Sequence, residues 1–284
     1  MGTLYIVGTP IGNLEDVTMR ALRVLREVDL IAAEDTRRTA RLLQHYSIAT
    51  PATSLHEHNE RGKTPGLIDR LRAGQSIAVV SDAGMPLVSD PGALLVRAAR
   101  AAGISVQVVP GPSAITAVLA GAGITGAFMF MGFPPSSGKA RGEWISEVGQ
   151  MTTIGAVVFF ESPHRFRRTM SLLLKELGDR PIIVGRELTK AFEELVEQPI
   201  SGFADSARVA RGEYVVVIPR VSESRKDAVD PASRPGPTEL ASEFGEMTEN
   251  GNLRPKAAAK ALALKYGLSA SDVYRLCVRG QEDT

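Results

Sequence analysis

The stretch that decides the fold is Val79-Val80-Ser81-Asp82-Ala83-Gly84-Met85-Pro86-Leu87-Val88-Ser89-Asp90-Pro91-Gly92. It follows an apolar run at 76–80 that is short and β-branched like a buried strand, and it precedes an Ala/Leu/Arg segment with helical spacing. This order predicts a strand, a loop and a helix, with Ser89 or Asp90 capping the helix and Pro91 in its first turn. Ligands bind beyond the carboxyl ends of strands in open α/β sheets, and glycine lets them approach the backbone. The alternative is a well-capped turn that binds no ligand.

Two further glycine loops follow predicted strands in the first half of the chain. The apolar run 4–7 leads into the loop 8–14, and the run 106–109 leads into the loop 110–114. Predicted strands alternate here with segments of helical spacing, which predicts an α/β fold with a largely parallel sheet covered on both faces. Those helical segments are 18–28, 39–45, 64–73 and 115–120.

The chain divides where its composition changes. Gly121, Gly123 and Gly126 mark a domain break, and a Ser-, Arg-, Asp- and Pro-rich segment starts near residue 222. We therefore predict an N-terminal α/β domain at 1–122, a C-terminal α/β domain at 123–221, a linker at 222–237 and a helical tail at 238–284. The second domain has predicted strands near 128–133, 156–160, 182–185 and 214–218, a helix at 166–177 and a basic loop containing Lys139 and Arg141. The tail has helices at 254–266 and 272–278, a pattern compatible with nucleic-acid contact or with a solvated surface.

Composition restricts the class of protein. The chain has 284 residues, 33 basic and 32 acidic, so its formal charge of +1 gives no global field for nucleic acid, and any such contact must be local. A single cysteine, Cys277, excludes an internal disulfide and argues against a cysteine-built metal site. The first residues run directly into a predicted strand without a signal-peptide pattern, and no stretch has the ~18 apolar residues of a membrane span. We expect a cytoplasmic protein that is not in the membrane.

The first glycine loop argues against a nucleotide-phosphate site. Its pattern is G-x-x-x-G and not G-x-G-x-x-G, and Pro10 removes an amide donor that a pyrophosphate would need. The chain also lacks the G-x-x-x-x-G-K-[ST] pattern of phosphate-binding loops. The three loops therefore favour a ligand without phosphates that is contacted mainly by the backbone.

Six motifs in order resemble those of the ribosomal RNA small-subunit methyltransferase I family, in the tetrapyrrole-methylase superfamily of S-adenosylmethionine enzymes. They are GTPIGNL at 8–14, AEDTR at 33–37, HEHNE at 56–60, SDAGMPLVSDPG at 81–92, VPGPSA at 109–114 and FESPHR at 160–165. The similarity runs from about residue 1 to residue 220, and the helical tail is also similar. The resemblance implies two α/β domains with the cofactor in the cleft between them, and a homodimer. It also implies 2′-O-methylation of a cytidine ribose in the decoding region of 16S rRNA, in the small ribosomal subunit.

The resemblance also implies which residues bind S-adenosylmethionine. A sulfonium and an ammonium group favour carboxylate and carbonyl neighbours, and adenine favours an apolar slot, which agrees with these positions. Asp82 is the foremost of them, and the alternative for it is a loop-capping aspartate. The expected cofactor residues are Pro10, Ile11, Asp82, Ala83, Gly84, Met85, Ser113, Ala114, Phe160, Glu161, Ser162, Leu188 and Val215.

Methyl transfer to a hydroxyl needs the oxygen held against the methyl carbon and its proton accepted. Asp35, His56 and Glu60 are candidate bases or orienters, and the alternatives are an ion pair of Asp35 with Arg37 and a surface histidine. His56 and His58 could bind a metal by residue type, but no third ligand has suitable spacing, so we assign no metal site. Candidate contacts to RNA phosphates are Arg37, Arg38, Arg41, Lys139, Arg141, Arg165 and Lys190, although exposed arginines often only solvate a helix.

Two other functions stay open at this point. The superfamily also methylates porphyrin-like rings and a modified histidine, and the cofactor loops do not distinguish these acceptors from RNA. A ribosome-binding scaffold without activity is a third possibility. The clusters at 34–37 and 56–60 and the helical tail favour RNA, and the intact loops at 82–84 and 111–113 count against a scaffold.

Overall fold

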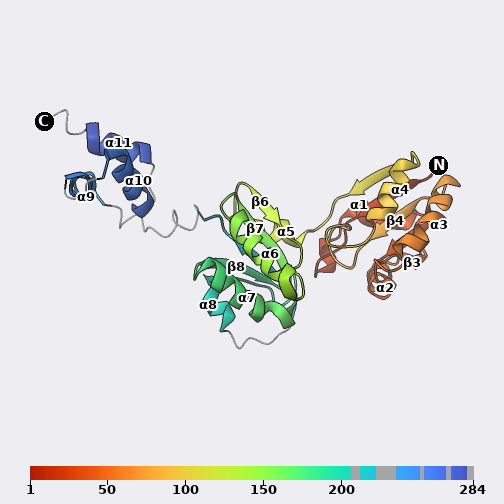
Figure 1. Cartoon of the computed structure of the whole chain (residues 1–284). Coiled ribbons are helices and arrows are strands. Elements are labelled where there is room, and N and C mark those ends of the chain that lie inside the picture. The colour runs from red at the N-terminus through yellow and green to blue at the C-terminus, as the bar shows by residue number, and fades with distance from the viewer. Residues whose placement is uncertain (206–211, 222–234, 250–252, 267–269, 280–284) are drawn as a thin grey trace. The chain divides into compact units, whose positions relative to one another are not determined.

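The computed structural model describes residues 1–205, 212–221, 235–249, 253–266 and 270–279 (Figure 1). The chain forms two compact units, Met1–Ile218 and Pro219–Thr284. The first unit contains two five-stranded sheets with their helices, and the second is helical.

The first sheet is parallel throughout, in the strand order β3-β2-β4-β1-β5. β2 and β4 are buried along their whole length, as expected for strands covered on both faces. One face packs Leu25 of α1 and Leu43 of α2, and the other packs Leu71 of α3 and Leu95 of α4. This sheet confirms the predicted α/β class. Its elements are β1 (Thr3–Val7), a 3₁₀ turn (Leu14–Asp16), α1 (Met19–Glu27), β2 (Leu30–Ala33), α2 (Thr36–His45), β3 (Ala52–Ser54), α3 (Glu60–Arg72), β4 (Ile77–Val80), α4 (Ala93–Ala101) and β5 (Ser105–Val109).

The second sheet is mixed, in the order β6-β7-β10-β8-β9, and only β6 and β7 are parallel. Three elements of this region were not predicted. β9 is an edge strand of charged and polar residues, α8 is a short helix that follows it, and α6 occupies the segment that we expected to be a basic loop. Three glycines weaken the helical pattern of α6, but Trp144, Ile145 and Val148 bury one face of it. The elements are β6 (Phe128–Phe130), α6 (Gly138–Met151), β7 (Ala156–Glu161), α7 (Pro163–Leu177), β8 (Pro181–Arg186), β9 (Glu194–Pro199), α8 (Ile200–Ala204) and β10 (Tyr214–Ile218).

Helix α5 (Ala114–Gly121) packs on the second sheet, although the predicted boundary after residue 122 assigns it to the first domain. Ile115 and Val118 lie in one apolar cluster with Val158, Ile183 and Val217. The chain therefore passes from the first core to the second in the loop 110–113, which is the third glycine loop. Glycines 121 and 123 only end the helix.

The tail has three helices, α9 (Pro237–Glu249), α10 (Pro255–Tyr266) and α11 (Ala270–Arg279). Leu240 and Phe244 of α9 pack with Leu262, Val273 and Cys277 of the other two. The helices α10 and α11 agree with the prediction, whereas α9 was not anticipated. Most of the predicted linker, residues 222–234, lies outside the described residues. In the parts of the chain that are described, every helix is too short or too polar to cross a membrane.

Candidate functional site

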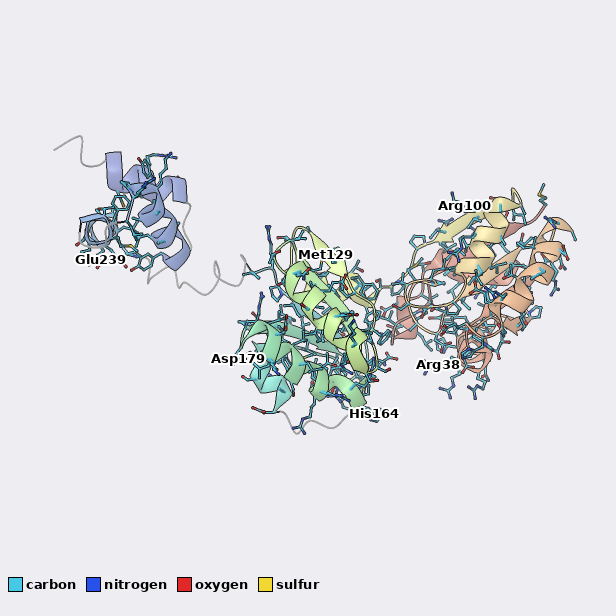
Figure 2. The ribbon with its side chains drawn as sticks, viewed as in Figure 1. Arg38, Arg100, Met129, His164, Asp179 and Glu239 are labelled. Carbon is cyan, nitrogen blue, oxygen red and sulfur yellow. The ribbon has the colours of Figure 1, made fainter. Side chains whose placement is uncertain are left out.

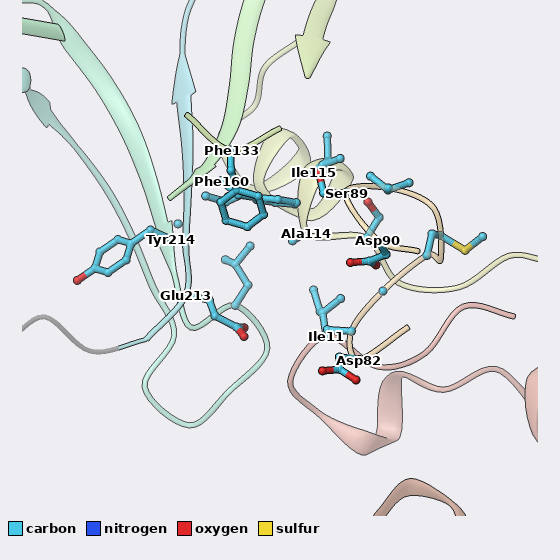
Figure 3. A pocket seen from close by; sticks show the side chains of 18 of the residues that line it. Ile11, Asp82, Ser89, Asp90, Ala114, Ile115, Phe133, Phe160, Glu213 and Tyr214 are labelled. Carbon is cyan, nitrogen blue, oxygen red and sulfur yellow. The ribbon is translucent and has the colours of Figure 1, made fainter. Parts of the chain in front are cut away.

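A pocket of about 450 Å³ lies in the unit Met1–Ile218, where loops that follow strands of both sheets come together (Figure 3). The first sheet contributes Ile11 after β1, Glu34 after β2 and the loop 82–90 after β4. The loop before α5 adds Ser113, and the second sheet adds side chains beyond β6, β7, β8 and at the start of β10. This volume is that of a small-molecule or cofactor site.

The expected cofactor residues surround this pocket, with one exception. Twelve of the thirteen line it, and Pro10 does not. Contact of each residue with a cofactor stays a prediction, but the structure brings together positions as far apart in sequence as Ile11 and Val215.

The three glycine loops pack against one another, which explains their glycines. Thr9 N donates to Gly84 O at 2.9 Å and Gly84 N donates to Thr9 O at 3.1 Å. A Cβ on Gly8 would lie 2.7 Å from the Cα of Gly111, too close for any other residue. Gly84 also has a left-handed backbone, with φ +79°. The loops therefore form one rigid floor of backbone groups beneath the pocket.

Carboxylates line one side of the pocket. Asp82 Oδ1 accepts the amide of Asp35 at 3.0 Å, and Asp82 Oδ2 lies 3.4 Å from Arg38 Nε. The Glu34 carboxylate accepts the amide of Asp82 at 3.2 Å. Burial raises the pKa of Glu34, with the Asp82 amide acting in the opposite direction. Burial, with the charge of Glu34 second, raises the pKa of Asp90 to about 7. This side of the pocket therefore favours a cation.

Asp35 is held by Arg37 instead of facing the pocket. Its carboxylate caps α2 by accepting the amide of Arg37 at 2.9 Å, and it accepts both Nε and Nη2 of the same side chain at 3.0 and 2.7 Å. These hydrogen bonds hold the pKa of Asp35 well below its usual range. The ion pair that the sequence left as an alternative is what forms.

Glu60 and His56 have structural partners outside the pocket lining. The Glu60 carboxylate is buried and accepts the amides of Leu94 and Leu95 at 2.7 and 3.2 Å, so it satisfies the first turn of α4. The prediction that Ser89 or Asp90 caps this helix was wrong, because Gly92 is the N-cap and Glu60 supplies the oxygen from α3. His56 Nε2 lies 2.8 Å from Asn59 Nδ2. Neither residue lines the pocket, and their roles as base or orienter stay predictions.

The basic residues divide into exposed and buried groups. Arg37, Arg38 and Arg41 are exposed on α2, and Arg38 also lines the pocket. Figure 2 labels Arg38 at the surface of the molecule. Lys139 is exposed on α6 and lies 3.4 Å from Glu143, while Lys190 is partly buried between Glu187 and Glu213.

Arg141 was wrongly expected to contact RNA. Its side chain is only 3% exposed and lies 3.7 Å from the buried Glu161, with Thr169 hydrogen-bonded to both. Arg165 lies 2.8 Å from Glu161 and donates to the carbonyl of Pro134 at 3.1 Å. These two arginines compensate one buried carboxylate. Arg141 is therefore not available to phosphates, whereas a contact of the partly exposed Arg165 with RNA stays a prediction.

Several residues of the pocket were not assigned from the sequence. Asp90 and Ser89 belong to the quoted central stretch, and Glu34 belongs to a quoted motif, so their position could have been inferred. Phe133 lies with its ring centroid 5.4 Å from that of Phe160, and Glu213 enters from the start of β10. These last two had no sequence signal.

Comparison with known proteins places this geometry in a family. The family described as Tetrapyrrole (Corrin/Porphyrin) Methylases matches residues 3–204. A protein of Halalkalibacterium halodurans named ribosomal RNA small subunit methyltransferase I is 41% identical over 282 residues, covering 97% of this chain and 94% of its own. A protein of Thermotoga maritima with the same name is 46% identical and covers 77% of this chain and 98% of its own.

Solved structures agree with the fold. A diphthine synthase superposes with a TM-score of 0.62 at 15% identity, covering 77% of this chain and 90% of that one. A uroporphyrin-III C-methyl transferase from Thermus thermophilus, complexed with S-adenyl homocysteine, has a TM-score of 0.54 at 17% identity, covering 76% of this chain and 97% of that one. From the sequence matches, the chain belongs to the tetrapyrrole methylases and, among them, to the ribosomal RNA small subunit methyltransferase I family.

Proposed function

We propose that this protein transfers a methyl group from S-adenosylmethionine to the 2′-oxygen of a cytidine ribose in 16S rRNA, in the decoding region of the small ribosomal subunit. The main support for this proposal is the pocket described above, because its lining suits S-adenosylmethionine, the cofactor expected for this methyltransferase family. Its lining includes residues in the ranges 11, 82–90, 113–115 and 160–163.

The pocket suits both halves of S-adenosylmethionine. Asp82 and Glu34 supply negative charge for a sulfonium and an ammonium group. Ile11, Phe133, Phe160, Leu188 and Val215 supply apolar and aromatic surface for an adenine ring. The bound cofactor supplies an electrophilic methyl group. The residues of the chain bind it, orient it and exclude water.

An RNA-binding surface adjoins the pocket through α2. The amide of Asp35, at the start of this helix, donates to Asp82, and the Arg38 side chain lines the pocket. Arg37 and Arg41 are exposed on the same helix, where guanidinium groups bind phosphates and fix the register of a nucleic acid. Phosphates held by α2 would bring the ribose beside the methyl donor. Lys139 and Lys190 are further proposed phosphate contacts.

The setting of the reaction follows from its substrate. We place the protein in the cytoplasm, where bacterial ribosomal subunits are found, and we propose a homodimer from the resemblance of its motifs to those of the family.

The test is methylation of small ribosomal subunits that lack the modification. The protein is incubated with these subunits and radiolabelled S-adenosylmethionine, and the label is mapped by nuclease protection and nucleoside analysis. Label in a single 2′-O-methylcytidine is expected. Label on a base or on a different acceptor would contradict the proposal, and absence of cofactor binding by calorimetry would favour a scaffold.

A further inference from the structure

We propose that the Asp90 carboxylate accepts the proton of the ribose 2′-hydroxyl during methyl transfer. The inference rests on the proposed function and assigns its proton acceptor. Asp90 lies on the loop between β4 and α4 and lines the pocket beside Val88 and Ser89. Figure 3 shows its carboxylate directed into the pocket, on the same side as Asp82.

The other acids of the pocket already have partners. Asp82 accepts an amide and lies 3.4 Å from Arg38, and Glu34 accepts the amide of Asp82. Glu161 is paired with Arg165, and Glu213 lies 3.1 Å from Lys190. Within the described parts of the chain, no lysine, arginine or histidine lies within 4.0 Å of the Asp90 carboxylate. Asp90 is therefore the pocket acid whose basicity is not reduced by a cation.

The surroundings of Asp90 set its proton affinity. Glu34 at the end of β2 and Asp82 in the same loop face it with negative charge, Ser81 at the end of β4 hydrogen-bonds to it, and Arg38 of α2 acts on the two other acids. Burial is the largest of these effects, Glu34 is second, and together they raise the pKa of Asp90 to about 7. A base is most effective when its pKa lies near the working pH.

The loop holds Asp90 in a fixed position. Leu87 and Ser89 have left-handed backbones, with φ +73° and +68°, although neither is glycine. Such conformations persist only where the surroundings determine them, and Leu87 packs into the core that contains Leu95 and Val79. The carboxylate is therefore positioned before a substrate binds.

The proposed step balances. The ribose oxygen forms the new bond to the methyl carbon, the bond from that carbon to the sulfonium sulfur breaks, and its electron pair stays on sulfur. The hydroxyl proton goes to a carboxylate oxygen of Asp90 and leaves for water after product release. One positive and one negative charge disappear together in the pocket, so the step leaves no unbalanced charge there.

The decisive experiment compares Asp90→Asn with the wild-type protein, using Asp69→Asn on α3 as a matched control. Asp69 is 74% exposed and lies outside the pocket. Single-turnover methylation of small subunits is followed as a function of pH at saturating cofactor. The wild-type rate should rise with pH through the pKa of Asp90 in the cofactor complex and then level off; the positive charge of the bound cofactor lowers this pKa below its value of about 7 in the free protein. Asp90→Asn should lose about 100-fold or more at every pH above that value, and Asp69→Asn should behave as wild type.

Binding and stability provide readouts apart from activity. Calorimetry with S-adenosylhomocysteine, which lacks the sulfonium charge, should give the same affinity for Asp90→Asn and wild type. A weaker affinity for S-adenosylmethionine alone, with an unchanged saturated rate, would make Asp90 a cation partner and overturn the proposal. In cofactor-free protein, Asp90→Asn should be more thermostable than wild type at alkaline pH.

The proposal can still be tested if Asp90→Asn does not fold. In that case the wild-type pH profile decides, because a rate that does not fall as the pH is lowered from about 8 to about 4 contradicts a carboxylate base. Wild-type protein that fails to methylate RNA would instead contradict the proposed function.

Discussion

Glu161, at the end of a strand of the second sheet, and Asp90, in a loop after a strand of the first, differ in whether arginine side chains pair with them. Glu161, the last residue of β7, is fully buried between Arg141 and Arg165. Asp90, ten residues beyond β4, is partly buried in a pocket where burial and, second, the charge of Glu34 raise its pKa. A buried carboxylate with compensating guanidiniums stabilises the fold, whereas one without them retains a high affinity for protons. The carboxylate of Glu161 therefore stabilises the fold, whereas that of Asp90, in our proposal, accepts a proton in the reaction.

Removing the charge of Glu161 should have the largest effect on stability. Glu161→Gln leaves the buried Arg141 without its carboxylate, and breaking a buried ion pair in this way costs about 3 kcal/mol or more. Burial already lowers the pKa of Arg141, with Glu161 acting in the opposite direction, so the variant makes its charged form still less favourable. Urea denaturation of the whole chain measures the change in free energy of unfolding.

A matched control separates burial from charge. Glu143→Gln removes an exposed carboxylate, 3.4 Å from Lys139 on α6, and should change the free energy of unfolding by less than about 0.5 kcal/mol. Equal effects of the two substitutions would contradict the structural role of Glu161.

Asp82→Asn should have the next largest effect, on cofactor affinity. The amide retains the shape of the side chain but removes a charge that faces the pocket, so binding of S-adenosylmethionine should weaken by about 100-fold, or about 2.7 kcal/mol. Calorimetry measures the affinity, and the melting temperature checks the fold. Affinity equal to that of wild type would remove Asp82 from the cofactor site.

Asp90→Asn should stabilise the cofactor-free protein at alkaline pH. The pKa of Asp90 is higher in the folded state than in the unfolded state. Its ionised form therefore destabilises the folded protein, and the free energy of unfolding falls as pH rises from about 4 through about 7. A shift of this size corresponds to about 4 kcal/mol for a fully desolvated group, which solvent exposure reduces to about 1 kcal/mol here. Thermal unfolding at about pH 4 and about pH 8 measures the difference. An equal effect of the substitution at both pH values would show that the environment does not raise this pKa.

The spacing of apolar and polar residues along the sequence was sufficient to predict the buried strands and the loops that follow them. β2 and β10 have the predicted bounds, because a short continuous apolar run between polar residues determines a buried strand. The loops of the pocket were located for the same reason, since each directly follows such a strand.

Long-range packing decided what the sequence did not reveal. Glu60 caps a helix that begins more than thirty residues later, and Arg141 pairs with an acid twenty residues away, so both looked like free polar residues. α5 follows the first sheet in sequence, yet its apolar residues belong to the second core. In each case the partner belongs to a separate helix or strand, so the spacing of neighbouring residues does not predict the contact.

Two arginines show the same contrast between a charge with a buried partner and a charge without one. Their substitution should give the smallest of the expected effects, a few-fold change in RNA affinity. Arg41 is exposed on α2, whereas Arg141 is enclosed with Glu161. Arg41→Gln should weaken binding to small subunits a few-fold and reduce the slope of log affinity against log salt by about 0.7 to 0.9, because one phosphate contact is lost. Fluorescence anisotropy over a salt series measures both quantities. Arg141→Gln should leave the slope unchanged while lowering the free energy of unfolding, since this guanidinium reaches no phosphate. A slope that falls for Arg141→Gln and not for Arg41→Gln would place the RNA on α6 and not on α2.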